Sequence, residues 1–331
     1  METQQAAVQL KDINTYFVGG QTHVLSGLPV THKSMVLNGA PREVNPNGAH
    51  MAGQMYVQEY RLAAPRCTVP VVLWHGGGMT GCTWETKPGG GTGWAWRFLE
   101  AGYDVIVCDA VERGRSSFAM SPQIYGSDPV FRTKEEGWTT FRLGLRYSAN
   151  ATERHVHEGQ RFPVEHFDDF VKQWVPRWPD NEARILAAYE ALIRKTGRCF
   201  IVGHSQGAGF AAEIANRLPH LVAGVVAVEP GGVPVAPNPD RLPPHLVVWG
   251  DHIQASGPYW SRYRAQATQY FAAAHQVASV TELDLPRNGI TGNSHFPMMD
   301  TNSDEVLALI CAWIASQSSN TETSMIQGDK S

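Results

Sequence analysis

A serine placed between two glycines is the part of this chain that most clearly suggests chemistry. Ser205 lies in a Gly-x-Ser-x-Gly pattern, between an apolar run that ends at Gly203 and small residues that begin beyond it. This order is typical of a strand that turns sharply into a helix and presents a nucleophilic hydroxyl. Glycines are needed at 203 and 207 because side chains there would collide in the bend. A glycine-rich connection without chemistry is the alternative interpretation.

A serine nucleophile requires a base within hydrogen-bonding reach and a third group that orients the base. We expect the base to be a histidine late in the chain, and His295 lies in the loop after the last predicted strand. His275 falls inside a predicted helix, and His75 ends the first buried strand. The sequence therefore favours His295 as the general base.

Two carboxylates compete for the role of the third group. Glu229 follows the apolar run 225–228 directly, and Asp251 follows Trp249 and Gly250. Both strand ends lie at the same edge of the predicted sheet as Ser205, so position alone does not decide between them. We predict Glu229 as the acid and keep Asp251 as the alternative, since an aspartate after a glycine is also typical of a turn.

The elements that must position these residues are predicted from alternating apolar and amphipathic runs. Such alternation indicates an α/β protein with a mostly parallel, doubly wound sheet and helices on both faces. A closing helix is expected from about Ser303 to Ser316. The buried strands are predicted at 69–74, 104–108, 200–202, 222–228, 246–249 and 277–283, with antiparallel edge strands near 15–18 and 55–62.

The interval between the strands that contain Cys108 and Cys199 is too long for one crossover helix. We therefore predict a helical cap insertion at 115–180, between core segments 1–114 and 181–316, with a disordered tail at 317–331. The insertion is rich in aromatic residues, and some of them should line an apolar substrate cavity. Candidates are Trp138, Phe141 and Trp174.

Composition narrows the class of protein. The net charge of −4 argues against a nucleic-acid partner, and no run approaches the roughly 18 apolar residues that span a bilayer. The start of the chain lacks the pattern of a secretory signal. The five cysteines are odd in number and widely spaced, as expected of free thiols in a reducing compartment. We therefore expect a cytoplasmic protein without a membrane or nucleic-acid partner.

The order of three motifs resembles the α/β-hydrolase superfamily, on its serine esterase and lipase side, over residues 55–316. The motifs are His75-Gly76-Gly77-Gly78 after the first parallel strand, the Gly203–Gly207 turn, and the late Ser294-His295. The resemblance implies an oxyanion hole made by the backbone N–H groups of Gln206 and Gly77, with Gly76 as the alternative to Gly77.

The chain also departs from the usual pattern of that superfamily. The usual acid lies three residues after the glycine that follows the seventh strand, and here that position is Ile253. This departure supports an acid after the sixth strand, which is Glu229. The cap is also expected between strands four and five, because the segment from Glu229 to Leu246 is too short to hold it.

The resemblance implies a serine carboxylic-ester hydrolase that works through an acyl-enzyme, with no metal or other cofactor. We expect the substrate to be a small, apolar ester. A lactone or a thioester could use the same three residues, and a non-catalytic small-molecule binding protein with this fold is the alternative from another class. The sequence leaves a homodimer open.

Overall fold

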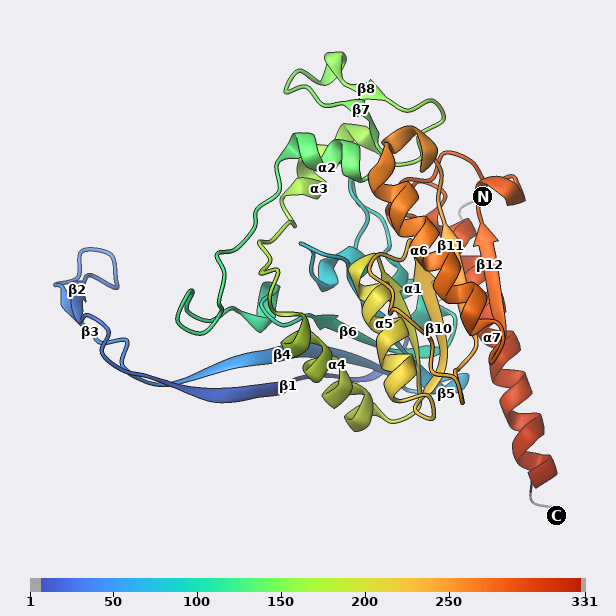
Figure 1. Ribbon diagram of the computed structural model, residues 1–331, viewed down its shortest axis with the longest axis horizontal. Helices are drawn as coiled ribbons and strands as arrows, with labels where there is room; N and C mark the ends of the chain where they lie inside the picture. Colours follow the sequence, from blue (N-terminus) through green and yellow to red (C-terminus); the bar gives the residue numbers. More distant parts are fainter. Residues whose placement is uncertain (1–6, 329–331) are drawn as a thin grey trace.

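An eight-stranded sheet organises the chain in the computed structural model, which describes residues 7–328 (Figure 1). Every neighbouring pair from β6 to β12 is parallel, and β4 is antiparallel to both of its neighbours. The predicted mostly parallel sheet is therefore confirmed. In spatial order the strands are β1 (Leu10–Leu25), β4 (Gly48–Leu62), β6 (Tyr103–Asp109), β5 (Cys67–Trp74), β9 (Cys199–His204), β10 (Val222–Val228), β11 (His245–Trp249) and β12 (Val280–Asp284).

Helices cover both faces of this sheet, and each face has its own apolar core. Along β5, Val72 and Trp74 contribute to one core while Val71 and Leu73 contribute to the other. All residues of β9, β10 and β11 are buried, as expected of parallel strands covered on both sides. One face carries α4 (Glu182–Thr196), α5 (Gln206–Arg217) and α6 (Pro258–Ala274), and the other carries α1 (Trp94–Glu100) and α7 (Ser303–Gly328).

Helix α7 is longer than the sequence suggested. It begins at Ser303 as expected, but it continues beyond Ser316 to Gly328. It thus occupies most of the segment that we expected to be disordered, and residues 329–331 of that tail lie outside the described residues. The physical reason is that the polar stretch contains no proline and no glycine before Gly328, so nothing in it breaks the helix.

The segment 115–180, where we predicted the cap, lies over the ends of the parallel strands (Figure 1). It is less helical than we expected, because its helices are short and a small antiparallel sheet joins them. Its elements are α2 (Lys134–Thr140), β7 (Gly144–Arg146), β8 (His155–Val156) and α3 (Phe167–Val171). Single 3₁₀ turns are η1 (Gly81–Trp84), η2 (Gly114–Ser116), η3 (Ala151–Glu153), η4 (Val164–His166), η5 (Gln254–Ser256) and η6 (Pro286–Asn288).

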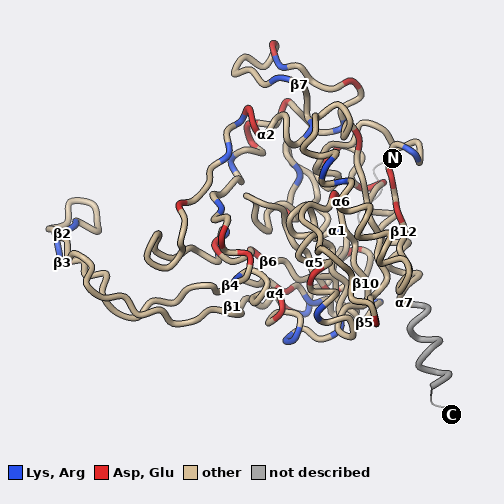
Figure 2. Tube along the Cα trace, viewed as in Figure 1, with Lys and Arg blue, Asp and Glu red and all other residues tan. Residues whose placement is uncertain are grey.

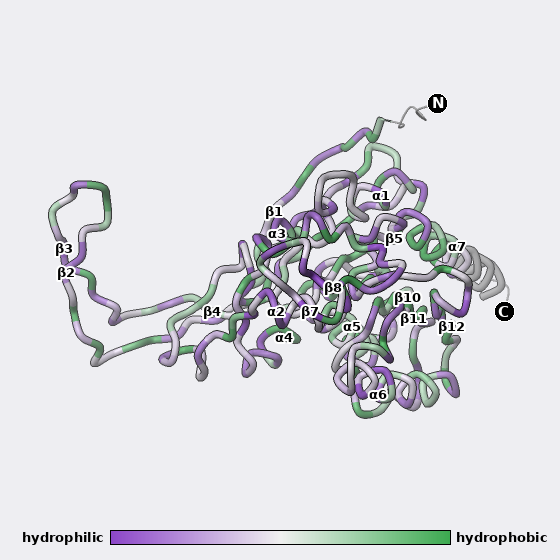
Figure 3. Tube along the Cα trace, turned by 90° about the horizontal axis from the view of Figure 1, so that it is seen from above, coloured by the Kyte–Doolittle hydropathy of each residue, from purple (hydrophilic) through white to green (hydrophobic). Residues whose placement is uncertain are grey.

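Strands β1 and β4 extend past the sheet as a long arm, which ends in the short pair β2 (Thr31–Lys33) and β3 (Arg42–Val44) (Figures 1 and 3). The arm carries few charged residues (Figure 2). At its tip the side chains of Met35, Val36 and Leu37 are exposed. The arm therefore presents apolar side chains well away from the body of the protein.

The helices within residues 7–328 include none that is both long and apolar enough to span a membrane.

Candidate active site

Ser205 lies at the turn between β9 and the first residue of α5. Its φ of +52° is in a region that non-glycine residues rarely adopt, which marks the sharp bend expected at this position. A Cβ atom on Gly203 would lie 2.6 Å from the carbonyl oxygen of Gly207, and one on Gly207 would lie 2.6 Å from that of Trp74. The two glycines therefore allow the backbone segments around Ser205 to pack closely.

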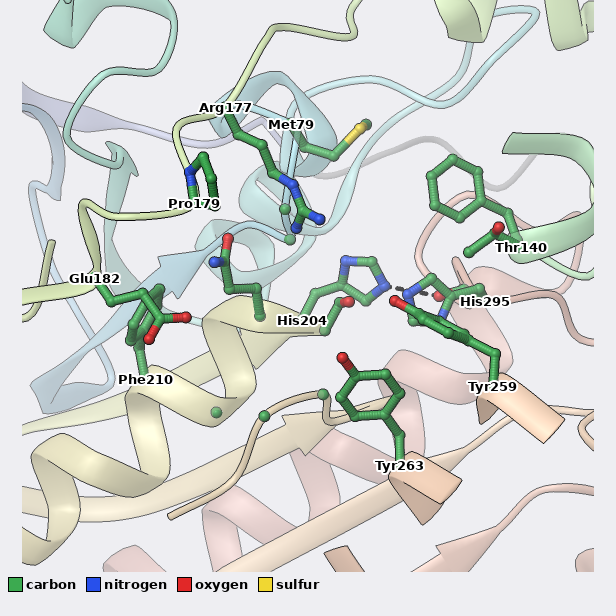
Figure 4. A pocket seen from close by; sticks show the side chains of 18 of the residues that line it. Met79, Thr140, Arg177, Pro179, Glu182, His204, Phe210, Tyr259, Tyr263 and His295 are labelled. Atoms are coloured by element: carbon green, nitrogen blue, oxygen red, sulfur yellow. Dashed lines mark hydrogen bonds between the residues drawn. The ribbon is translucent and has the colours of Figure 1, made fainter. Parts of the chain in front are cut away.

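His295 lies in the loop between β12 and α7, and backbone bonds fix its position. Its N–H donates to the carbonyl of Phe141 at 3.0 Å, and its own carbonyl pairs with Nε2 of His204 at 2.7 Å (Figure 4). Its Nδ1 lies 3.0 Å from Oε2 of Glu229. The ring thus directs Nδ1 to a carboxylate and leaves Nε2 for a second partner, as a general base requires.

Glu229 is fully buried at the end of β10 and has three polar partners. Besides His295, its carboxylate accepts a bond from the N–H of Gly250 and pairs with Nη2 of Arg142 at 2.7 Å. Burial alone would raise the pKa of Glu229, but the charge of Arg142 and the hydrogen bond from His295 outweigh it and lower the pKa to about 2. The carboxylate is therefore ionised at neutral pH and can stabilise a charged imidazole.

The pKa of His295 is lowered to about 4, because burial outweighs the attraction of Glu229 and because Arg142 and Arg132 add positive charge nearby. The imidazole is consequently neutral at pH 7. A neutral ring with Nδ1–H bonded to Glu229 has its lone pair on Nε2, where a proton can be accepted. Ser205 and His295 line the same cavity.

Asp251, the alternative acid, has a different environment. Its carboxylate accepts the N–H of His252 at 2.7 Å and that of Gly292 at 2.9 Å. Its carbonyl accepts Nε of Arg142 at 2.7 Å. Asp251 therefore ties together loops around the site, whereas Glu229 is the carboxylate that contacts the His295 ring.

Asp300 supports the loop of His295 and was not singled out by the sequence. It is buried, and it accepts bonds from the N–H and the hydroxyl of Ser294 at 2.9 and 2.7 Å and from Nδ2 of Asn293 at 2.8 Å. Burial raises the pKa of Asp300 to about 7. No local sequence signal marks it, because its contacts with Asn293 and Ser294 form only when the loop folds.

The expected oxyanion-hole residues Gly76, Gly77 and Gln206 all line the cavity with Ser205. A Cβ atom on Gly76 would lie 2.9 Å from Nδ1 of His204 and 3.1 Å from Cβ of Ser205, so no larger residue fits there without movement. At Gly77 the corresponding position lies 2.9 Å from Nη1 of Arg177.

His75 holds the glycine loop in place. Its Nε2 accepts the N–H of Ala110 at 2.9 Å, so its Nδ1 carries the proton and donates to the carbonyl of Gly76 at 2.9 Å. Burial lowers the pKa of His75 to about 4, which keeps this ring neutral. His75 is therefore a support for the loop and not a competitor of His295.

The cavity has a volume of about 400 Å³, and its walls come from the core and from the insertion (Figure 4). Of the three aromatic candidates only Phe141 lines it. Trp138 packs against Phe167 with ring centroids 5.1 Å apart, and Trp174 packs behind Phe141 at 5.7 Å. These two tryptophans therefore support the wall. The sequence could not show this, because the aromatic content of the insertion does not reveal which rings face inward.

Several cavity residues were missed by sequence reasoning. On α6, Tyr259, Trp260 and Tyr263 line the cavity. The spacing of four residues between Tyr259 and Tyr263 was a usable signal, since it places both rings on one side of a helix. Arg132 and Arg177 of the insertion also line the cavity, and no local pattern indicated them.

Comparison with known proteins tests the predicted fold and class of protein. No family model matches the chain. A bacterial esterase solved at atomic resolution superposes with a TM-score of 0.81 and 28% sequence identity, over 96% of this chain and 99% of the esterase. A protein from Fungal sp. (strain ATCC 74256), described as the probable secreted lipase phiG, is 25% identical over 80% of this chain and 86% of its own length. The predicted α/β-hydrolase fold and the predicted class, a carboxylic-ester hydrolase, are confirmed.

One expectation is corrected by the same comparison. We expected a cytoplasmic protein from the cysteines and from the start of the chain, whereas the fungal relative is described as secreted. All five cysteines are unpaired in the structure. Unpaired cysteines were nonetheless an insufficient basis for a compartment, because a thiol that packs in a core stays free wherever no partner thiol is near.

Proposed function

We propose that this ester hydrolase uses Ser205 as its nucleophile, His295 as its general base and Glu229 as the acid that orients the base. The observation that carries the proposal is the contact of the neutral His295 ring with the ionised, buried Glu229, in a cavity that Ser205 shares. The insertion at 115–180 acts as a cap over this cavity.

In the first half-reaction, Oγ of Ser205 attacks the ester carbonyl carbon while Nε2 of His295 takes the hydroxyl proton. The carbonyl oxygen becomes an oxyanion, and the N–H groups of Gln206 and Gly77 stabilise it. The position of Ser205 at the first turn of α5 supports this role, because the helix dipole favours negative charge there. When the carbon–oxygen bond to the alcohol breaks, His295 returns the proton to the leaving oxygen and the acyl group stays on Ser205.

In the second half-reaction, His295 takes a proton from water, whose oxygen attacks the acyl carbon. Collapse of the second tetrahedral intermediate returns the proton to Ser205 and releases the carboxylic acid. Glu229 stabilises the imidazolium in both half-reactions. The pair of Arg142 with Glu229 holds the carboxylate in place, so Arg142 is a positioning residue.

The substrate is a small ester, since the cavity is of the size that holds such a molecule. Phe141, Tyr259 and Tyr263 line the cavity and would contact its apolar part. Figure 4 shows the two tyrosines. Lactones and thioesters form the same tetrahedral intermediate, so kcat/KM over matched ester, lactone and thioester substrates distinguishes the three.

The direct test is hydrolysis of a short neutral ester by the wild type and by Ser205→Ala. Loss of at least about 10³-fold in kcat supports the proposal, since removal of a nucleophile eliminates the acyl-enzyme route. Ser34→Ala on the exposed arm is the matched control and should keep full activity. Retention of activity in Ser205→Ala would sink the proposed mechanism.

We also infer a homodimer that packs through the arm. A two-stranded hairpin is marginally stable when it stands alone in water, so a second copy of the chain would stabilise it. The exposed side chains of Met35, Val36 and Leu37 provide the apolar contact. Light scattering should give the mass of a dimer for the wild type and of a monomer when these three residues are replaced by serine. A wild-type monomer would contradict the inference.

A further inference from the structure

Two part-buried arginines in the wall of the cavity lack the buried carboxylate partners that the fully buried arginines near the site have. From them we propose that the ester carries a carboxylate group, which Arg177 and Arg132 bind beside the scissile bond. This inference rests on the proposed function of the site, and it narrows the substrate class to acidic esters.

Arg177 is held rigidly next to the glycine loop. Its N–H donates to the carbonyl of Val130 at 3.2 Å, and its carbonyl accepts the N–H of Val130 at 2.8 Å. The N–H of Val175, two residues earlier, donates to the carbonyl of Gly78 at 3.0 Å. The side chain points into the cavity, toward the part where His204 and His295 lie (Figure 4). Its Nη1 is 2.9 Å from the Cβ position of Gly77, so its guanidinium group is next to the proposed oxyanion hole.

Arg132 lies on the neighbouring segment and reaches the same loop. Its Nη1 is 3.5 Å from the carbonyl oxygen of Gly77, and its guanidinium group stacks over the ring of Phe141 at 4.6 Å. Its side chain is only 16% exposed, and its ionic partner is Glu136, which is 52% exposed and 3.2 Å away. A mostly exposed carboxylate contributes little to an ion pair, because solvent screens it.

The fully buried arginines near the site have buried carboxylates of their own. Arg142 pairs with Glu229, and Arg113 pairs with Glu112 at 3.1 Å. For Arg177, by contrast, no carboxylate among the described side chains of residues 7–318 lies at ion-pair distance. Removing even part of a guanidinium group from water without a counter-ion is unfavourable, so the part-buried Arg177 gains stability when an anion binds.

The charges of the two arginines also act on each other. Burial lowers the pKa of Arg132, Glu136 opposes this change, and the nearby charge of Arg177 lowers the pKa further. Two like charges that converge on one cavity wall create a field that favours an anion.

The acidic residues of the cavity do not neutralise this field. Glu182 is exposed and lies beside Phe210 (Figure 4), and Glu213 pairs with Arg217 at 2.7 Å.

A carboxylate is the anion that can both bind these guanidinium groups and form part of an ester substrate. Guanidinium groups bind carboxylates through two parallel N–H bonds, which fixes orientation as well as charge. Because Arg177 and Arg132 both approach Gly77, the carboxylate must lie a few bonds from the scissile carbonyl. A monoester of a short dicarboxylic acid has this arrangement, with its apolar chain against Phe141.

The test compares monomethyl glutarate with methyl 5-methylhexanoate, in which an uncharged isopropyl group replaces the carboxylate. The wild type should prefer the acidic ester. In Arg177→Met and Arg132→Met the ratio of the two kcat/KM values should fall by about 10- to 100-fold, the range of a lost hydrogen bond to a charged group, and mainly through KM for the acidic ester. Arg177→Lys should retain part of the preference, because it keeps the charge.

Arg262→Met is the matched control, because Arg262 is exposed on α6 and does not line the cavity. It should leave both kcat/KM values unchanged. An equal loss of kcat for both esters in Arg177→Met would overturn the inference and assign Arg177 to the oxyanion. A wild type that prefers the neutral ester would overturn it as well.

A binding measurement separates this inference from the proposed function. Calorimetric titration of Ser205→Ala with monomethyl glutarate should show binding that weakens by about 10- to 100-fold when Arg177→Met is added. If the wild type hydrolyses neither ester but this difference in binding persists, the proposed function fails and the carboxylate site stands. If Ser205→Ala binds the acidic ester no better than the double variant does, the carboxylate site is refuted.

Discussion

Replacing Glu229 by glutamine is the perturbation that separates the two candidate acids most sharply. The change keeps the shape of the side chain and removes its charge. His295 then loses the group that stabilises its protonated form, and Arg142 loses its buried counter-ion. Because an amide can also bind the ring in the wrong tautomer, we expect a loss of about 10⁴-fold in kcat, as for other triads that lose this charge.

The effect on stability can be worked out from the shift in the pKa of Glu229. The pKa falls from 4.5 to about 2 on folding, which corresponds to roughly 3 kcal/mol of unfolding free energy at neutral pH. The folded-state pKa is the lower one, so this stabilisation is present above pH 4.5 and is lost as the pH falls through about 2. Breaking a buried ion pair typically costs about 3–5 kcal/mol, which agrees in size.

The assay pairs kcat for a neutral ester at pH 7 with urea unfolding, for Glu229→Gln and for Asp251→Asn. Asp251 accepts two backbone N–H bonds and its amide can still accept one, so its variant should lose no more than about tenfold in activity. Glu229→Gln should lose both activity and stability. If Asp251→Asn abolishes turnover while Glu229→Gln stays within about threefold of the wild type, the assignment of the acid is refuted.

Two further predictions concern pH. The pKa of His295 is lowered to about 4, and its neutral form is the base. We therefore expect kcat/KM to be flat near neutrality and to fall as the pH drops through about 4. A fall in kcat/KM near pH 6.5, the usual pKa of histidine, would contradict the burial of the ring. The pKa of Asp300 is raised from 3.8 to about 7, so the stability that its protonated form contributes is complete below pH 3.8 and is lost as the pH rises through about 7. Urea unfolding between pH 4 and 8 should show this decline in the wild type and not in Asp300→Asn, and parallel pH curves for the two proteins would rule it out.

The sequence indicated the residues whose roles follow from local pattern and strand order. Ser205 is set by glycines that permit a tight turn, and His295 and Glu229 follow from the rule that parallel strands end at one edge of a sheet. The structure brings the side chains of His295 and Glu229 into contact and places His295 and Ser205 in one cavity. The parallel part of the sheet was also predictable, since buried apolar runs alternate with helices.

The sequence was silent where long-range packing decides. Arg142 reaches Glu229 from the insertion, across 87 positions of the chain, and nothing near either residue signals the pair. Trp138 and Phe141 are near neighbours in sequence, yet only Phe141 lines the cavity, because Trp138 packs against Phe167 within the insertion. The length of α7 was underestimated because polarity was taken as a sign of disorder although the stretch has no helix breaker.

The most direct test of the central claim is intact-mass analysis after reaction with a fluorophosphonate, which labels an activated serine. The account predicts one rapid addition to the wild type, located at Ser205, and none to Ser205→Ala. Labelling should be slow in Glu229→Gln and close to the wild-type rate in Asp251→Asn. No labelling of the wild type, or labelling that persists in Ser205→Ala, would contradict the claim that Ser205 is the nucleophile.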